Sequence, residues 1–180
     1  MKKLNKHIKE ALKAEDQSII DMLDFFAKSC SGVQQALFKQ KVKDADSVDI
    51  VPLSEVFSEE EIKEIKKRVR PVPKSCYENA WKLCDRFEYE DKHEIKYCEG
   101  YLNYKGLLIA HAFNRVDGKY VDITFELALN KKIEDTYVVI GEYDTDKVRE
   151  ILLQNGYYGN IYETIFLNKY NEHIDKKSAA

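Results

Sequence analysis

The sequence predicts an α+β fold in which helices pack on an antiparallel β-sheet. Apolar residues recur every three or four positions through the first forty residues, which is typical of helices. From about residue 95 the apolar period changes to two, which is typical of strands. Asp117-Gly118 separates two of these strand segments and is a strong signal for a two-residue hairpin.

The composition is that of an ordinary globular protein. Hydrophobic residues make up 44% and charged residues 34% of a 180-residue chain. We expect a single domain over 1–180, with a helical N-terminal portion (1–70) and an α+β core (71–170). The formal net charge of −3 gives no basic excess, so we expect no nucleic-acid partner.

The cysteines indicate a reducing compartment. Cys30, Cys76, Cys84 and Cys98 form no C-x-x-C pair and are too few for a disulfide scaffold. We therefore expect free thiols and a cytoplasmic location. The basic N-terminus has no apolar stretch after it, and no segment approaches about 18 consecutive apolar residues, so neither a secretory signal nor a membrane partner is expected.

Two capping-box patterns predict where helices begin. Ser58 and Glu61 form a capping box before a helix that we expect to end near Val69, ahead of Pro71. Ser75 and Glu78 form a second box, which makes Cys76 the first residue of a helix over 76–88. Residues 33–53 give no decisive pattern.

The remaining elements follow from period and turn signals. A helix near 145–155 should end at Asn155-Gly156. Strands are expected at 95–103, 106–115, 119–125, near 137–142 and near 161–167.

The position of Cys76 gives the thiol a special environment. At the first turn of a helix, unpaired backbone N–H groups and the positive end of the helix dipole favour an anion. A thiol there can have its pKa lowered from about 8.5 to about 3.5–7.5. Cys76 is therefore a candidate nucleophile.

The hairpin register supplies a candidate base. If Val116 pairs with Lys119, His111 and Asp122 lie on one face as diagonal neighbours, about 7 Å apart at Cβ. A carboxylate there can accept a hydrogen bond from the imidazole, which fixes its tautomer and stabilises its charged form. Leu107, Ile109 and Phe113 share this face, which we expect to pack against the helix that begins at Cys76.

Three segments carry a family resemblance: SCYENAWKLC (75–84), YCEGYL (97–102) and HAFNRVDGKYVDITF (111–125). Together they resemble the core of the transglutaminase-like group within the papain-like cysteine enzymes. The resemblance implies a papain-like core in which Cys76 is the nucleophile, His111 moves the proton and Asp122 orients His111. Cys98 also resembles a nucleophile segment, but only twelve residues separate it from His111, which leaves no room for a helix; whether Cys98 replaces Cys76 stays open.

We therefore expect a Cys-His-Asp hydrolase or acyltransferase. A thiol protease, an amidase or deamidase, and a transglutaminase-like transferase all attack an amide or ester carbonyl and pass through a thioester. The substrate would be a protein, a peptide-like molecule or a small amide. Asn79 and Tyr101 are candidate substrate contacts, and the backbone N–H of Cys76 is a candidate oxyanion donor.

Two other interpretations of the same residues are a binding module and a zinc site. A non-catalytic protein-binding module with the same fold is the alternative, since fold does not dictate function. A zinc site built from the three cysteines Cys76, Cys84 and Cys98 with His111 matches no common structural-zinc spacing. We expect neither a metal nor a cofactor.

Overall fold

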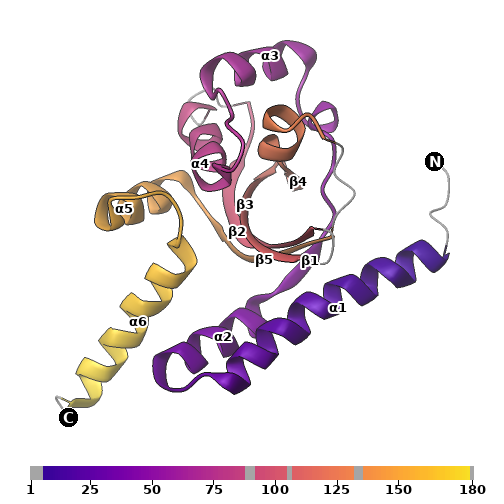
Figure 1. The fold of residues 1–180 in the computed structure, drawn as a ribbon. Coiled ribbons are helices and arrows are strands. Elements are labelled where there is room, and N and C mark those ends of the chain that lie inside the picture. Colours follow the sequence, from indigo (N-terminus) through magenta and orange to yellow (C-terminus); the bar gives the residue numbers. More distant parts are fainter. Residues whose placement is uncertain (1–5, 88–91, 105–106, 132–135, 179–180) are drawn as a thin grey trace.

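The computed structural model describes residues 6–87, 92–104, 107–131 and 136–178 as an α+β fold (Figure 1). Helices pack around a curled five-stranded sheet. The helical elements are α1 (Lys6–Ser29), α2 (Gly32–Asp44), η1 (Leu53–Glu55), α3 (Glu59–Arg68), α4 (Cys76–Phe87), η3 (Thr124–Ala128), α5 (Thr145–Asn155) and α6 (Ile161–Ser178). The strands are β1 (Asp46–Val48), β2 (Ile95–Tyr104), β3 (Leu107–Val116), β4 (Lys119–Val121) and β5 (Thr136–Tyr143).

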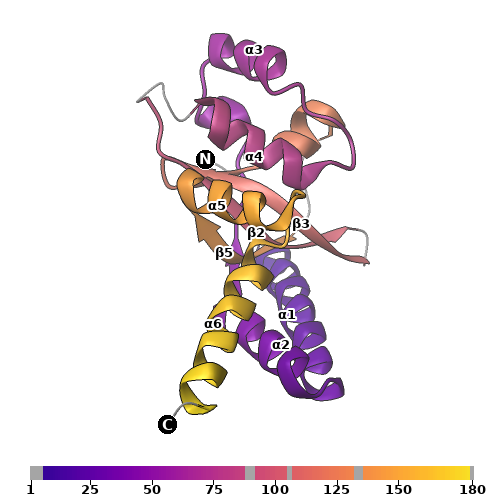
Figure 2. The same cartoon turned by 90° about the vertical axis from the view of Figure 1, so that its left-hand side faces the viewer.

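The strands lie in the order β1-β5-β2-β3-β4, and each named pair is antiparallel. β1 pairs with β5, so the N-terminal portion contributes an edge strand as well as helices. In both views α1 and α2 lie at the opposite end of the molecule from α3 and α4 (Figures 1 and 2). In the described part of the chain, no helix is both long and apolar enough to cross a bilayer.

The two faces of the sheet bury different sets of side chains. The outer face carries Tyr97, Tyr101, Ala112 and Val138 and is covered by helices, including α1, α2, α4 and α5. The inner face carries Cys98, Phe113, Tyr137 and Val139, which pack with Phe125 of η3. The sheet curls around η3 (Figure 1).

The predicted hairpin register is confirmed, but its second strand is shorter than expected. Val116 pairs with Lys119 and Asn114 with Val121, after which β4 ends. The Asp122 carboxylate causes this end, because its Oδ1 accepts hydrogen bonds from the backbone N–H groups of Thr124 (2.8 Å) and Phe125 (3.1 Å). The chain therefore turns into η3 where we expected residues 119–125 to continue as a strand.

The helix predictions hold except at the C-terminal end. The Ser58–Glu61 capping box is present, and α5 ends at Gly156, which adopts φ 74°. The expected strand at 161–167 is wrong, because this segment begins α6. The buried Glu99 carboxylate accepts hydrogen bonds from the N–H groups of Ile161 (3.1 Å) and Tyr162 (2.9 Å), so a distant side chain caps the helix.

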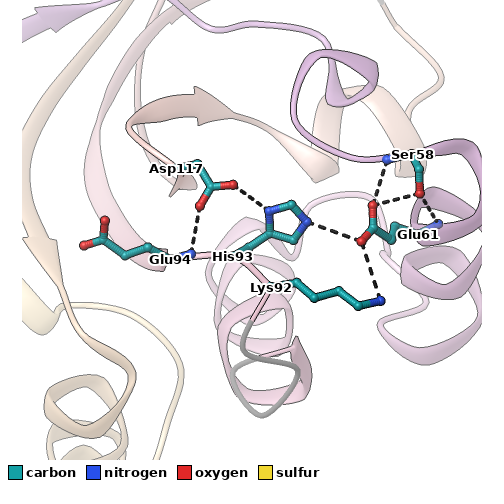
Figure 3. Close-up of polar contacts among 6 residues, drawn as sticks. All are labelled: Ser58, Glu61, Lys92, His93, Glu94 and Asp117. Atoms are coloured by element: carbon teal, nitrogen blue, oxygen red, sulfur yellow. Dashed lines mark hydrogen bonds and ion pairs between the residues drawn. The ribbon is translucent and has the colours of Figure 1, made fainter.

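A polar cluster around His93 holds the hairpin turn against α3 (Figure 3). His93 Nδ1 lies 2.6 Å from the Asp117 carboxylate, and Nε2 lies 3.4 Å from the Glu61 carboxylate. Asp117 Oδ1 also accepts a hydrogen bond from the backbone N–H of Glu94 (2.9 Å). Because Asp117 begins the turn that leads through β4 to Asp122, this cluster helps to fix the position of Asp122.

The His93 cluster predicts a pH-dependent contribution to stability. Burial lowers the His93 pKa, but hydrogen bonds and charges from Asp117 and Glu61 raise it above its ordinary 6.5. The hydrogen bond from His93 is the main cause that lowers the Asp117 pKa. The hydrogen bonds from Ser58 are the main cause that lowers the Glu61 pKa, and His93 contributes as well. The imidazolium contribution is complete below about pH 6.5 and is lost as the pH rises through the folded pKa, whereas the carboxylate contribution is lost below about pH 4.5.

His93→Gln should therefore reduce the free energy of unfolding most between about pH 4.5 and 6.5. Urea denaturation of both proteins across this range measures the difference. A difference that stays constant from about pH 5 to 9 would contradict the assignment.

Candidate active site

Cys76 is the first residue of α4, as the sequence predicts. The first intrahelical bond runs from the Asn79 N–H to the Ser75 carbonyl (2.8 Å), so the N–H groups of residues 76–78 precede the helical ladder. The second capping box is not formed as expected. The Ser75 N–H donates to the Val72 carbonyl (3.3 Å), and the Glu78 carboxylate pairs with Lys82 (2.6 Å).

α4 reaches His111 by a different route from the one we expected. Its body packs on the outer face, where Ala80 and Cys84 contact Ala112 and Asn114 donates to the Ala80 carbonyl (3.0 Å). His111 belongs to the inner face, with its ring 5.9 Å from that of Tyr137. Only the N-terminus of α4 meets His111, beside β3 and beyond the end of β4.

The predicted packing of the His111 face against α4 is therefore wrong, except where the N-terminus of the helix meets His111. Leu107 and Ile109 share the His111 face in the strand alternation, yet they are 66% and 38% exposed. Phe113, at the other end of the same row, is buried.

His111 and Asp122 form a buried hydrogen-bonded pair. His111 Nε2 lies 2.6 Å from Asp122 Oδ2, although β4 ends one residue before Asp122. The same oxygen accepts a hydrogen bond from the Tyr137 hydroxyl (2.7 Å), while Oδ1 caps η3. All the hydrogen bonds that this carboxylate accepts favour its ionised form.

The pair favours a charged imidazole. Burial lowers the His111 pKa, but the charge and hydrogen bond of Asp122, joined by Cys76, raise it to about 10. Burial raises the Asp122 pKa, but His111, Tyr137 and the Phe125 N–H together hold it below its ordinary value. At neutral pH the site therefore holds an imidazolium against a carboxylate.

The Cys76 thiol responds to this imidazolium. Burial raises the thiol pKa, yet the hydrogen bond and charge of His111 and the backbone N–H of Ala112 bring it below the ordinary value. Since His111 Nε2 is engaged by Asp122, Nδ1 is the ring nitrogen available to the sulfur. Cys76 is half-buried, whereas His111 and Asp122 are 4% and 0% exposed, so the thiol is the member of the group that a substrate can reach.

The two expected substrate contacts have other surroundings. Asn79 is buried and exchanges two hydrogen bonds with the Val72 backbone (2.8 and 3.0 Å), while its amide donates to Thr124 (3.0 Å). It therefore holds the loop before Cys76 to η3. Tyr101 lies on the outer face, where its hydroxyl accepts a hydrogen bond from Lys41 (3.1 Å), so it is not beside the Cys-His-Asp group.

The other cysteines lie elsewhere. Cys98 is fully buried in β2 opposite Phe113, and burial is the main cause that raises its pKa well above the ordinary value. Cys84 is buried in α4, and Cys30 lies between α1 and α2. These surroundings favour Cys76 over Cys98 as the reactive thiol. Within the described ranges, no cluster of His, Cys, Asp or Glu side chains could hold a metal ion.

Tyr137 is the site residue that sequence reasoning missed. It lies on β5, fifteen residues after Asp122, and nothing local to residue 137 marks it as a carboxylate partner. The approach of Tyr137 to Asp122 depends on Gly100 of β2, which pairs with His111 of β3. A Cβ on Gly100 would lie 1.9 Å from the Val138 carbonyl oxygen, so only glycine lets β5 pass this close to β2 at the level of His111.

Comparisons with known proteins find no relative: no family model matches the chain, and neither a curated protein nor a solved structure matches it.

Asp122→Asn should lower the His111 pKa markedly from about 10, because burial is then opposed by Cys76 without the Asp122 charge. The Cys76 pKa should rise, since a neutral imidazole no longer stabilises the thiolate. NMR titration of the His111 ring measures the first shift. Tyr137→Phe is the matched control, as it removes one hydrogen bond to Asp122 but keeps the charge. An unchanged His111 titration in Asp122→Asn would contradict the assigned pairing.

Proposed function

We propose that this protein is a cysteine-dependent acyl-transfer enzyme in which Cys76, His111 and Asp122 act together. The observation that carries the proposal is the meeting of three features at one point. A half-buried thiol starts a helix, its pKa is lowered by His111, and His111 is held 2.6 Å from a buried carboxylate. An activated thiol, a base and a group that orients the base are the parts required for nucleophilic catalysis.

The proposed reaction proceeds in two halves. The Cys76 thiolate attacks an amide or ester carbonyl, and the carbonyl π electrons move onto oxygen to give a tetrahedral oxyanion. The N–H of Cys76, at the start of α4, is the donor that we assign to this oxyanion. When the intermediate collapses, the C–N or C–O bond breaks and the imidazolium of His111 gives its proton to the leaving group.

The second half returns the enzyme to its starting state. Neutral His111 takes a proton from water or an amine, which attacks the thioester. The C–S bond then breaks, and the sulfur leaves as thiolate beside the restored imidazolium. Water gives hydrolysis and an amine gives transfer, so peptidase, amidase, deamidase and transglutaminase-like activities share these residues. Asp122 keeps Nδ1 of His111 facing the sulfur and stabilises the ring while it is charged.

The resemblance to transglutaminase-like enzymes supports the same assignment. It gives the roles to the same three residues in the same chain order. A cysteine at a helix N-terminus beside antiparallel strands that bring a histidine and an aspartate together is also the arrangement that a papain-like core implies. We therefore propose that the curled sheet and α4 form such a core.

The test is acylation by p-nitrophenyl acetate. Wild type should release one p-nitrophenolate per chain in a rapid phase and carry an acetyl group on Cys76, which peptide mass spectrometry locates. Cys76→Ala should lose this rapid phase. His111→Gln should slow it by at least about 100-fold, because general acid–base catalysis typically contributes that much.

Cys30 serves as an internal comparison, because it is a free thiol outside the site. Acetyl groups that appear on Cys30 as fast as on Cys76, with no dependence on His111, would contradict the proposal. The chain would then be better described as a binding module without catalysis.

A further inference from the structure

The edge of β3 beside the catalytic group has no strand partner. β3 lies between β2 and β4, but β4 pairs only with residues 114–116. Residues 107–113 of β3 therefore face no described strand on that side. The residues at 107, 109 and 110 are exposed, so the first half of this edge is open to solvent.

The alternation of the strand shows which backbone groups point to the open edge. Val116 and Lys119 close the two-residue turn, so Val116 directs its backbone groups toward β4. The neighbouring Asp117 N–H instead bonds with the Glu94 carbonyl on the β2 side (3.0 Å). Counting back in steps of two from Val116, the N–H and C=O groups of Asn114, Ala112, Ala110 and Leu108 also point away from β2.

Cys76 occupies one position in this row. The Ala112 N–H is the backbone donor that stabilises the Cys76 thiolate, in agreement with the alternation. Ala110 and Leu108 are the next two residues in the row, at steps of about 7 Å along the strand. A chain paired with them would lead directly to the sulfur.

We propose that the substrate is an extended peptide, which pairs as an added strand with the edge groups of Leu108 and Ala110 and brings its reactive carbonyl to Cys76. This proposal rests on the proposed function and specifies its substrate class. Strand addition to an open sheet edge takes affinity from main-chain hydrogen bonds and specificity from alternate side chains. The exposed Leu107 and Ile109 lie on the His111 face of the sheet. Every second side chain of a paired peptide would lie on the same face, so these peptide side chains should be apolar.

The experiment uses acetylated tetrapeptide vinyl sulfones of leucine and alanine, with each backbone amide N-methylated in turn. The Cys76 thiolate adds to the double-bond carbon remote from the sulfone, and the carbanion next to the sulfone takes the His111 proton. The rate of modification is measured by mass spectrometry. For each protein it is divided by the iodoacetamide rate at Cys76, which needs no peptide contact.

The pairing predicts an alternating result. N-methylation should slow modification by about tenfold at amides whose N–H points to β3, and by little at the amides between them. Replacing the peptide leucine that lies beside Leu107 by aspartate should also slow modification, because it puts a charge against an apolar side chain. Leu107→Lys should reverse this preference, because its ammonium group attracts the aspartate.

Two failures have different meanings. If iodoacetamide and the vinyl sulfones both leave Cys76 no more reactive than Cys30, the proposed function fails and the edge proposal fails with it. If Cys76 reacts readily but N-methylation shows no alternation and Leu107→Lys does not change the preference, strand pairing is overturned while the acyl-transfer proposal stands. Neither outcome depends on a variant at Ala110 or Leu108, where a substitution could disturb the sheet.

Discussion

The buried contact between His111 and Asp122 is the interaction on which the rest of the structure depends. Asp122 is fully buried, and a buried carboxylate is stable only when it is paired and its oxygens are hydrogen-bonded. Removing one partner of such a pair typically costs about 3–5 kcal/mol, because the other charge is left uncompensated. The partners come from β3, η3 and β5, so the same contacts close the inner face and prepare the imidazole for Cys76.

Asp122 also controls access to the site. By capping η3 with Oδ1, it ends β4 and leaves residues 107–113 of β3 without a described strand partner on that edge. If the strand had continued to residue 125 as expected, it would have occupied the edge at Ala112, where the Cys76 sulfur lies. The side chain that orients the base therefore creates the space for the nucleophile.

Local signals were enough to predict the elements that carry Cys76 and His111, and the turn that leads to Asp122. The Asp117-Gly118 turn fixed the register that joins His111 to Asp122, and a helix start placed Cys76. Some of the failures depend on a partner far away in the chain. Glu99 caps α6, and the Asn79 amide donates to Thr124. The early end of β4 has a local cause, because the Asp122 carboxylate accepts hydrogen bonds from Thr124 and Phe125. Tyr101 pairs with Ala110 rather than His111, and this register with β3 assigns it to the other face.

The central claim is that Cys76 and His111 form a thiolate–imidazolium pair. The most direct measurement is the rate of Cys76 alkylation by iodoacetamide as a function of pH, in wild type and in His111→Gln. Wild type should reach its full rate well below about pH 8.5, the ordinary thiol pKa, and His111→Gln should move the rise to higher pH. A wild-type rate that rises only above about pH 8.5, or one that His111→Gln leaves unchanged, would contradict the account.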